Sequence, residues 1–135
     1  MINLVGIDHI VLRADDYQGL IDFYCRVLGA QVERALEDLG LTQLRAGNAL
    51  IDIVDVHGEL GRSGGPAPST QGNNLDHFCL QIEPFDEAAL QGYLREHGIE
   101  TGEFAERYGA QGMGRSLYIH DTEGNVVELR AVQRQ

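Results

Sequence analysis

Two short stretches of this 135-residue chain read almost alike, and this internal repeat constrains the fold more than any other feature. "IDHIVL" begins at Ile7 and "LDHFCL" begins at Leu75, with a histidine in the third position of each. Both stretches are rich in branched and aromatic residues, which is typical of β-strands. The repeat therefore predicts two copies of one structural module.

After each repeated strand, the apolar residues change to helical spacing. The first predicted helix covers Tyr17–Leu28 and the second covers Glu87–His97. Each has a short acidic residue that suits an N-cap and a glycine that suits the left-handed position after the last turn. These residues are Asp15 or Asp16 with Gly29 for the first helix, and Asp86 with Gly98 for the second.

Further strands follow each helix, so both halves are expected to read β-α-β-β with one more strand directly after the helix. The predicted strands are Leu41–Arg45, Ala49–Val56, Ser116–His120 and Val126–Ala131. Between the halves lies "HGELGRSGGPAPSTQGNN", whose glycines and prolines indicate a linker or surface loop. We expect one domain over 1–135, with module one at about 1–56, the linker at about 57–74 and module two at about 75–135.

Composition narrows the class of protein. Hydrophobic content of 43% and charged content of 23% are ordinary for a globular chain. A net charge of −11 argues against nucleic acid and anionic membranes as partners. No apolar run approaches the roughly 20 residues that span a bilayer, and the start lacks a signal-peptide pattern. With only Cys25 and Cys79 and no CxxC, we expect a cytoplasmic protein.

Strand alternation places the two repeated histidines on the faces that point away from the predicted helices. His9 and His77 hold this position in their strands, and Glu128 holds it in the last strand, "GNVVELRA". A carboxylate in the middle of an apolar strand is costly to bury without a partner. We expect these three side chains to form a two-histidine, one-carboxylate site for Fe, Mn, Ni, Co or Zn as divalent ions.

The chain resembles the vicinal oxygen chelate superfamily, also called the glyoxalase/bleomycin resistance protein/dioxygenase superfamily. The resemblance covers essentially the whole chain and rests on "IDHIVL", "FYCRVLG", "LDHFCL" and "GRSLYIHDTEGNVVELR". The family tail usually has proline where this chain has Thr122. The resemblance implies an α+β fold of two βαβββ modules that form a U-shaped, incomplete barrel around a divalent metal. It also implies ligand roles for His9, His77 and Glu128, and a homodimer.

The last strand of the first module, "GNALIDIVDV", decides the subclass, because glyoxalase I-like members carry a fourth ligand there. If the two Gly-Asn pairs are aligned, Ile51 lies opposite Glu128 and no fourth ligand is present. With one extra residue in the turn, Asp52 takes that place. Strand alternation favours an inward Asp52, which then serves as a ligand, a water-linked ligand or a general base.

Other residues near the predicted site suit substrate binding or catalysis. Ser116 and Tyr118 alternate onto one face. Similar Ser and Tyr positions line the substrate cavity in thiol-transferring relatives, so the resemblance implies that the two residues line a polar pocket. Tyr118 is also a candidate catalytic residue. Arg13 and Arg130 lie on strands that carry predicted ligands, and both are suited to bind an anionic group of a substrate. The alternatives for the arginines are a place at the solvent rim, or an ion pair with Glu128, which is also a candidate general base.

Two classes of function follow. The first is a metal-dependent enzyme, a glyoxalase I-like lyase or isomerase that acts on a small substrate with two adjacent oxygens. The second is a metal-free binding protein that sequesters a ligand, as bleomycin-resistance relatives do. A small extradiol dioxygenase is a further alternative, although such enzymes usually have an additional pair of modules. The histidine and carboxylate triad favours the enzyme, since a sequestering protein has no need for it.

Overall fold

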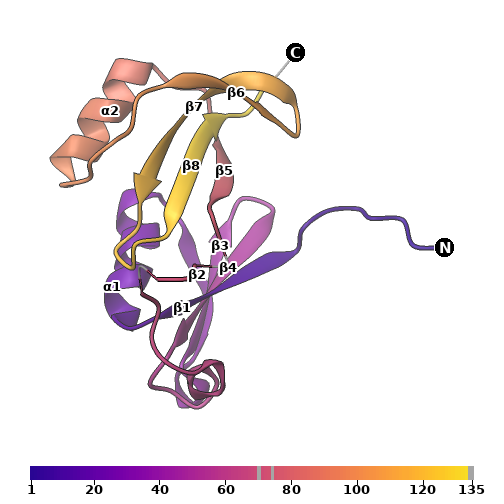
Figure 1. The fold of residues 1–135 in the computed structure, drawn as a ribbon, viewed down its shortest axis with the longest axis vertical. Coiled ribbons are helices and arrows are strands. Elements are labelled where there is room, and N and C mark those ends of the chain that lie inside the picture. Colours follow the sequence, from indigo (N-terminus) through magenta and orange to yellow (C-terminus); the bar gives the residue numbers. More distant parts are fainter. Residues whose placement is uncertain (70, 74, 134–135) are drawn as a thin grey trace. The chain divides into compact units, whose positions relative to one another are not determined.

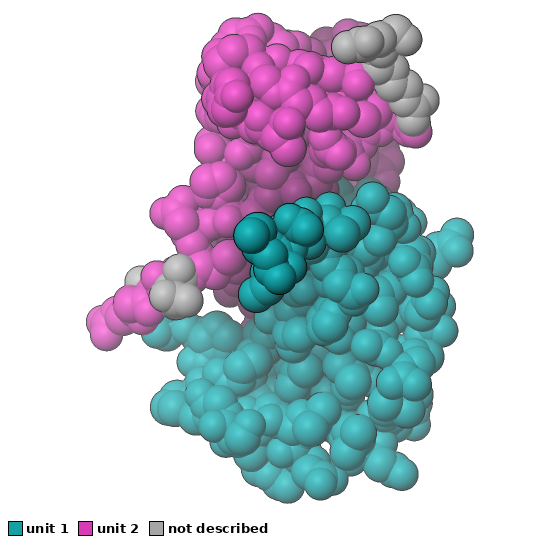
Figure 2. Space-filling view, turned by 90° about the vertical axis from the view of Figure 1, so that its right-hand side faces the viewer, with its two compact units in different colours: residues 1–70 teal, residues 71–135 magenta. Residues whose placement is uncertain are grey.

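The sequence repeat appears as two units of the same topology in a computed structural model. The units are Met1–Thr70 and Gln71–Gln135, drawn in separate colours in Figure 2, and each is described by itself. The structure describes residues 1–69, 71–73 and 75–133. Thr70 and Asn74 of the expected linker, and the last two residues of the expected second module, lie outside the described residues.

The first unit is a four-stranded mixed sheet with a helix between its first two strands (Figure 1). The strand order is β1-β4-β3-β2, in which β1 and β4 are parallel and the other pairs are antiparallel. Residues ahead of β1 form an extended segment, and a short 3-10 helix, Gly61–Gly64, follows β4. The elements are β1 His9–Ala14, α1 Tyr17–Asp22, β2 Gln31–Leu36, β3 Leu41–Ala46 and β4 Ala49–Asp55.

The second unit repeats this arrangement with the order β5-β8-β7-β6. Here β5 and β8 are parallel, while β7 pairs antiparallel with both β8 and β6. None of the described helices is both long and apolar enough to cross a bilayer. The elements are β5 Phe78–Ile82, α2 Glu87–Glu96, β6 Ala105–Gly109, β7 Gly112–His120 and β8 Val126–Ala131.

The predicted α+β class and the βαβββ order of both modules are confirmed, including the extra strand after each helix, which is β2 or β6. The glycines after the helices, Gly29 and Gly98, have the expected left-handed backbone, with φ of 82° and 75°. Asp16 caps α1 through a bond from the Gly19 amide to its carboxylate. Asp86 is the N-cap residue of α2 as predicted, although its side chain makes no capping hydrogen bond.

The first helix differs from the continuous α-helix that the apolar spacing predicts. It is α-helical only to Asp22 and continues as a π-helical turn over Phe23–Val27. The Leu28 amide donates to the Phe23 carbonyl, five residues back, at 3.4 Å. This wider turn turns both aromatic rings inward, since Phe23 and Tyr24 are buried and their centroids lie 5.2 Å apart edge to face.

Strand alternation separates a core face from a polar face in each sheet. On the core face of the first sheet, Ile10 pairs with Ile51 and Leu12 pairs with Ile53, and α1 contacts both of these strands. In the second sheet, Val127 and Leu129 of β8 and Ile119 of β7 are buried on the core face. Leu94 of α2, which lies beside this sheet in Figure 1, is fully buried as well. The opposite face of each sheet carries the histidine and the acidic residue described below.

The turn between β7 and β8 is organised by one buried carboxylate. Asp121 Oδ1 accepts from the amides of Glu123 and Asn125, and Oδ2 accepts from the Asn125 side chain, all at 2.8–2.9 Å. Gly124 supplies the left-handed residue of the turn, with φ of 84°. The turn therefore sets the start of β8, and through it the position of Glu128.

Replacing Asp121 with alanine should destabilise the protein, because two backbone amides and one side-chain amide lose their acceptor. We expect the free energy of unfolding to fall by about 1–3 kcal/mol, measured by urea denaturation followed by circular dichroism. Asp38→Ala, an acidic residue of another turn, is the control and should change stability little. An Asp121→Ala protein as stable as the wild type would show that the turn holds without this carboxylate.

Candidate metal centre

In the first sheet, the register places Asp52 on the same face as His9. His9 pairs with Leu50, and Val11 pairs with Asp52, so all four side chains point to one side of the sheet. In the second sheet, Glu128 pairs with Cys79, two residues after His77, in the same way. Asp52 is thus the counterpart of Glu128, whereas Ile51 lies 2% exposed on the core face. The alignment with Asp52 opposite Glu128 is the one that the structure shows.

One ring nitrogen of His9 is hydrogen-bonded to the carboxylate of the preceding residue. Its Nδ1 atom lies 2.6 Å from Asp8 Oδ1. This hydrogen bond is the largest cause that raises the pKa of His9 above its ordinary value of 6.5, and the charges of Asp52 and Asp8 act in the same direction. Asp52 therefore lies close enough to His9 to act on its charge.

Asp52 is 4% exposed and is only half satisfied by hydrogen bonds. Its Oδ2 atom accepts from Gln43 Nε2 at 3.1 Å. Its Oδ1 atom is buried and has no hydrogen-bond partner among the described residues. An unsatisfied buried carboxylate oxygen is unfavourable, so Oδ1 marks a place where a cation or a donor is needed.

The second unit brings His77 and Glu128 into direct contact. His77 Nε2 lies 3.2 Å from Glu128 Oε1, while His77 Nδ1 lies 2.7 Å from Asp76 Oδ2. Glu128 is 6% exposed. Both ring nitrogens thus face carboxylates, which only accept hydrogen bonds when ionised. An imidazolium that donates from both nitrogens satisfies the two carboxylates in the metal-free protein. When Nδ1 alone is protonated and donates to Asp76, Nε2 presents a lone pair beside Glu128, and the two atoms are suited to bind one cation.

Two donor atoms 3.2 Å apart fit adjacent positions on one metal ion. Ligand bonds of about 2.1 Å at right angles place the two donor atoms about 3.0 Å apart. In known metal sites the ring nitrogen that does not bind the metal usually donates to a carboxylate or carbonyl. Asp8 and Asp76 are placed to do this for His9 and His77. The donor set of imidazole and carboxylate also suits the expected divalent metals.

The three predicted ligands are divided between the units, since His9 belongs to the first and His77 and Glu128 belong to the second. Within the described parts of the chain, no three His, Cys, Asp or Glu side chains gather as a metal-binding group. The structure therefore shows two half-sites, each with one histidine and one buried carboxylate.

Tyr118 and Ser116 share the ligand face of the second sheet, and a residue missed by the sequence analysis joins them. The Tyr118 ring lies edge-on to His77, with centroids 5.1 Å apart. Arg107 of β6 places its guanidinium 4.4 Å from the Tyr118 ring centroid. Arg107 Nη1 donates to Ser116 O at 2.5 Å and to Ser116 Oγ at 3.0 Å. Within the described residues, Nε and Nη2 of Arg107 make no hydrogen bond and are available to a ligand.

Arg13 and Arg130, the arginines favoured by the sequence, are both engaged with backbone. Arg13 donates from Nη1 and Nη2 to the carbonyls of Gly61, Gly65 and Pro66 at 2.6–3.1 Å. Arg130 is 4% exposed and donates from Nη2 to the Gly112 carbonyl at 3.0 Å. Their role in substrate binding stays a prediction, and Nε of Arg13 is buried without a hydrogen-bond partner among the described residues.

The Cys79 thiol also lies on this face, beside Glu128. Loss of solvation around its sulfur, together with the Glu128 carboxylate, raises the pKa of Cys79 to about 11. The thiol is therefore neutral near pH 7, and its sulfur does not offer a thiolate ligand in the metal-free protein.

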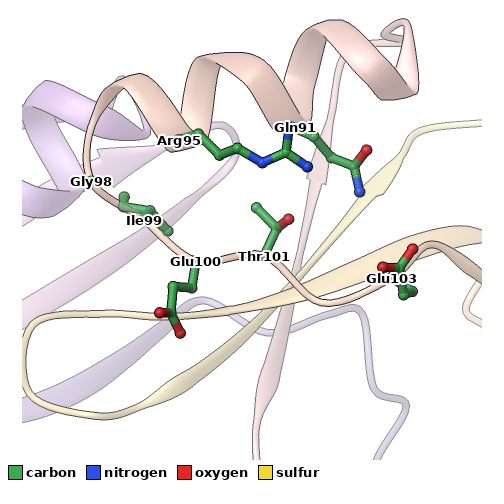
Figure 3. A pocket seen from close by; sticks show the side chains of 7 residues that line it. All are labelled: Gln91, Arg95, Gly98, Ile99, Glu100, Thr101 and Glu103. Carbon is green, nitrogen blue, oxygen red and sulfur yellow. The ribbon is translucent and has the colours of Figure 1, made fainter.

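A surface pocket of about 430 Å³ lies elsewhere in the second unit, between the end of α2 and the segment that follows it (Figure 3). Arg95 and Gln91 extend from the helix toward Thr101. None of the predicted site residues lines this pocket, and it holds no histidine. Its lining is Gln91, Arg95, Gly98, Ile99, Glu100, Thr101 and Glu103.

Comparison with known proteins identifies the family. A model of the Glyoxalase/Bleomycin resistance protein/Dioxygenase superfamily matches residues 6–129. The chain is 30% identical over 129 residues to glyoxalase domain-containing protein RDO1 of Mycosarcoma maydis, covering 95% of this chain and 69% of that protein. It is 23% identical over 133 residues to mitochondrial methylmalonyl-CoA epimerase of Homo sapiens, covering 94% and 74%.

A solved structure supports the same assignment. A virulence protein of Salmonella typhimurium superposes with a TM-score of 0.76 at 26% identity, over 98% of this chain and 100% of that one. The chain belongs to the glyoxalase/bleomycin resistance protein/dioxygenase superfamily, as its sequence motifs predicted.

The contact between His9 and Asp8 is open to direct measurement. In the metal-free protein, proton NMR of the His9 ring should give a pKa above 6.5, because the neighbouring carboxylates favour the charged imidazole. Asp8→Asn should bring this pKa down toward 6.5. Asp22→Asn, which removes a carboxylate from α1, is the control and should leave it unchanged. A His9 pKa at or below 6.5 in the wild type would contradict the described contact.

Proposed function

We propose that this protein is a metal-dependent enzyme, a glyoxalase I-like lyase or isomerase that acts on a small substrate with two adjacent oxygens. In this proposal His9, His77 and Glu128 bind one divalent ion of Fe, Mn, Ni, Co or Zn. The observation that carries it is the His77 ring held between the carboxylates of Asp76 and Glu128. With Nδ1 directed to Asp76, Nε2 of His77 and Oε1 of Glu128 are placed to act as two neighbouring ligands.

The first unit supports the same proposal independently. His9 has Nδ1 engaged by Asp8, as His77 has by Asp76, so Nε2 is the nitrogen left for a metal in both. Besides Nε2 of His9, the first unit offers Oδ1 of Asp52, which has no hydrogen-bond partner among the described residues and is suited to bind a cation. We propose Asp52 as a fourth ligand or as the general base near the metal.

The chemistry follows from these side chains. A bound divalent ion supplies Lewis-acid polarisation of the substrate oxygens. Asp52 Oδ1, without a hydrogen-bond donor among the described residues, is suited to accept a proton from a carbon next to a carbonyl. Glu128 is the second candidate base, and the Tyr118 hydroxyl is suited to hold a proton on the substrate oxygen. The likeness to an epimerase supports the isomerase branch of this proposal.

Arg107 indicates the kind of substrate. Its stacking on Tyr118 and its bonds to Ser116 fix the guanidinium on the predicted ligand face, with Nε and Nη2 left over in the described structure. A guanidinium edge binds carboxylates and phosphates through paired hydrogen bonds. We propose that the substrate carries an anionic group that Arg107 binds, while Ser116 and Tyr118 line the pocket.

The setting and partners remain proposals of the same kind. Cys25 and Cys79 are both free thiols in the described structure, which is consistent with the cytoplasm as the proposed compartment. We propose a homodimer that binds a small molecule and neither nucleic acid nor membrane.

The proposed metal site is tested by metal content and affinity. Protein purified without chelator should carry about one divalent ion per chain, measured by plasma mass spectrometry. Alanine in place of His9, His77 or Glu128 should lower the affinity by orders of magnitude, because each change removes one of three ligands. His57→Ala is the matched control, because that ring pairs with Asp15 outside the predicted site. Undiminished binding in the triple variant would refute the assignment of these ligands, whereas a wild type that carries and binds no metal would leave the metal-free binding protein.

Asp52→Asn separates the four-ligand type of site from the three-ligand type. The change keeps the side-chain volume, so the fold should remain. Metal affinity should fall, or turnover of an accepted substrate should drop by about 10²–10⁴-fold if Asp52 is the base. Asp38→Asn is the control for loss of one surface charge. If both metal affinity and turnover are unchanged, Asp52 takes no part and the chain is of the three-ligand type.

A further inference from the structure

A row of three polar side chains crosses the first sheet and ends at Asp52. Arg34 of β2 pairs with Gln43 of β3, and Gln43 pairs with Asp52 of β4. Because paired residues point to the same side of a sheet, the three side chains lie next to one another. Arg34 Nε donates to Gln43 Oε1 at 2.5 Å, and Gln43 Nε2 donates to Asp52 Oδ2 at 3.1 Å.

The direction of this row is fixed by its first member. A guanidinium only donates hydrogen bonds, so Arg34 holds the oxygen of the Gln43 amide on its own side. The amide NH₂ must then face Asp52, where it can only donate. Gln43 thus occupies Oδ2 and leaves Oδ1 as the single oxygen of Asp52 with no partner among the described residues.

The row differs from the ion pair that also links β2 and β3, which joins Glu33 and Arg45. Arg45 meets Glu33 directly, with Nη2 2.9 Å from Oε2, and each charge neutralises the other on the surface. In the row, Gln43 stands between Arg34 and Asp52. The neutral Gln43 amide orients the Asp52 carboxylate but does not form an ion pair with it. The carboxylate therefore has no cationic side chain bonded to it among the described residues.

We infer that Arg34 and Gln43 are positioning residues that present Oδ1 of Asp52 to the metal ion as its one free oxygen. This inference rests on the proposed function, because it needs a metal ion at the site. Arg34 acts only through Gln43, and Gln43 acts only through Asp52. The dependence is therefore sequential, which a set of independent surface contacts would not show.

The test is a double-mutant cycle on Co²⁺ affinity, measured by isothermal titration calorimetry on the full chain. Gln43→Met keeps the length of the side chain but removes the amide, and should weaken Co²⁺ binding about 10–100-fold. Arg34→Ala should weaken it by a smaller factor, because the amide is then free to turn over. The double variant should bind as Gln43→Met does, since Arg34 has no other route to the metal.

Two further measurements separate positioning from a general effect. Thermal melting of metal-free Arg34→Ala should stay close to that of the wild type, because this side chain is exposed. The Gln43 variants should melt at a lower temperature, because Asp52 Oδ2 loses its donor, so their Co²⁺ affinity is measured well below the melting temperature. Arg26→Ala, which removes an equal charge from the π-helical turn after α1, should leave Co²⁺ affinity unchanged. Gln43→Val gives a second variant without the amide, in a residue that favours strands, should Gln43→Met not fold.

The outcomes are distinct. Wild-type protein that does not bind Co²⁺ overturns the proposed function and this inference with it. Wild-type protein that binds Co²⁺, together with Gln43 variants that bind equally well, overturns the inference alone. An Arg34→Ala effect that appears in full on top of Gln43→Met also overturns it, because Arg34 then acts through its charge and not through the amide.

Discussion

A buried carboxylate beside a strand histidine is the interaction on which the rest of the site depends. Glu128 and Asp52 lie in the middle strands of their sheets and are almost completely buried. Neither forms an ion pair with an arginine in the described structure; Glu128 faces an imidazole, and Asp52 faces an amide. A buried charge of this kind is tolerated only with a compensating partner. Each copy of the module thus has one buried carboxylate beside a histidine that is suited to bind a cation.

The sequence was enough to predict much of this arrangement. The repeated "DH" strands predicted two modules, and strand alternation put His77 and Glu128 on one face, where the structure shows them 3.2 Å apart. The same alternation favoured Asp52 over Ile51, and the register between β1 and β4 agrees. These predictions succeeded because they depend on the two-residue period of a strand, which the sequence displays directly.

Other features depend on contacts that the chain order does not display. Gln43 reaches Asp52 because of the register between β3 and β4, and Arg107 reaches Tyr118 across a neighbouring strand. Arg130 shared the ligand face as predicted, yet the β6–β7 hairpin engages it: Gly109 and Gly114 leave it room, and Gly112 accepts from it. The π-helical turn, which has two buried rings packed edge to face, was not indicated by the helical spacing of the apolar residues. Hairpin register and loop packing would have been needed to predict these.

The position of a bound metal ion tests the proposed ligands most directly. Crystals soaked in Co²⁺ should show, at the cobalt absorption edge, one anomalous peak per site that lies about 2.0–2.2 Å from Nε2 of His9, Nε2 of His77 and a carboxylate oxygen of Glu128. Binding through Nε2 is required, because Asp8 and Asp76 engage both Nδ1 atoms. A peak bound through Nδ1, a peak at other residues, or no peak in protein that is otherwise folded would contradict the proposed ligands.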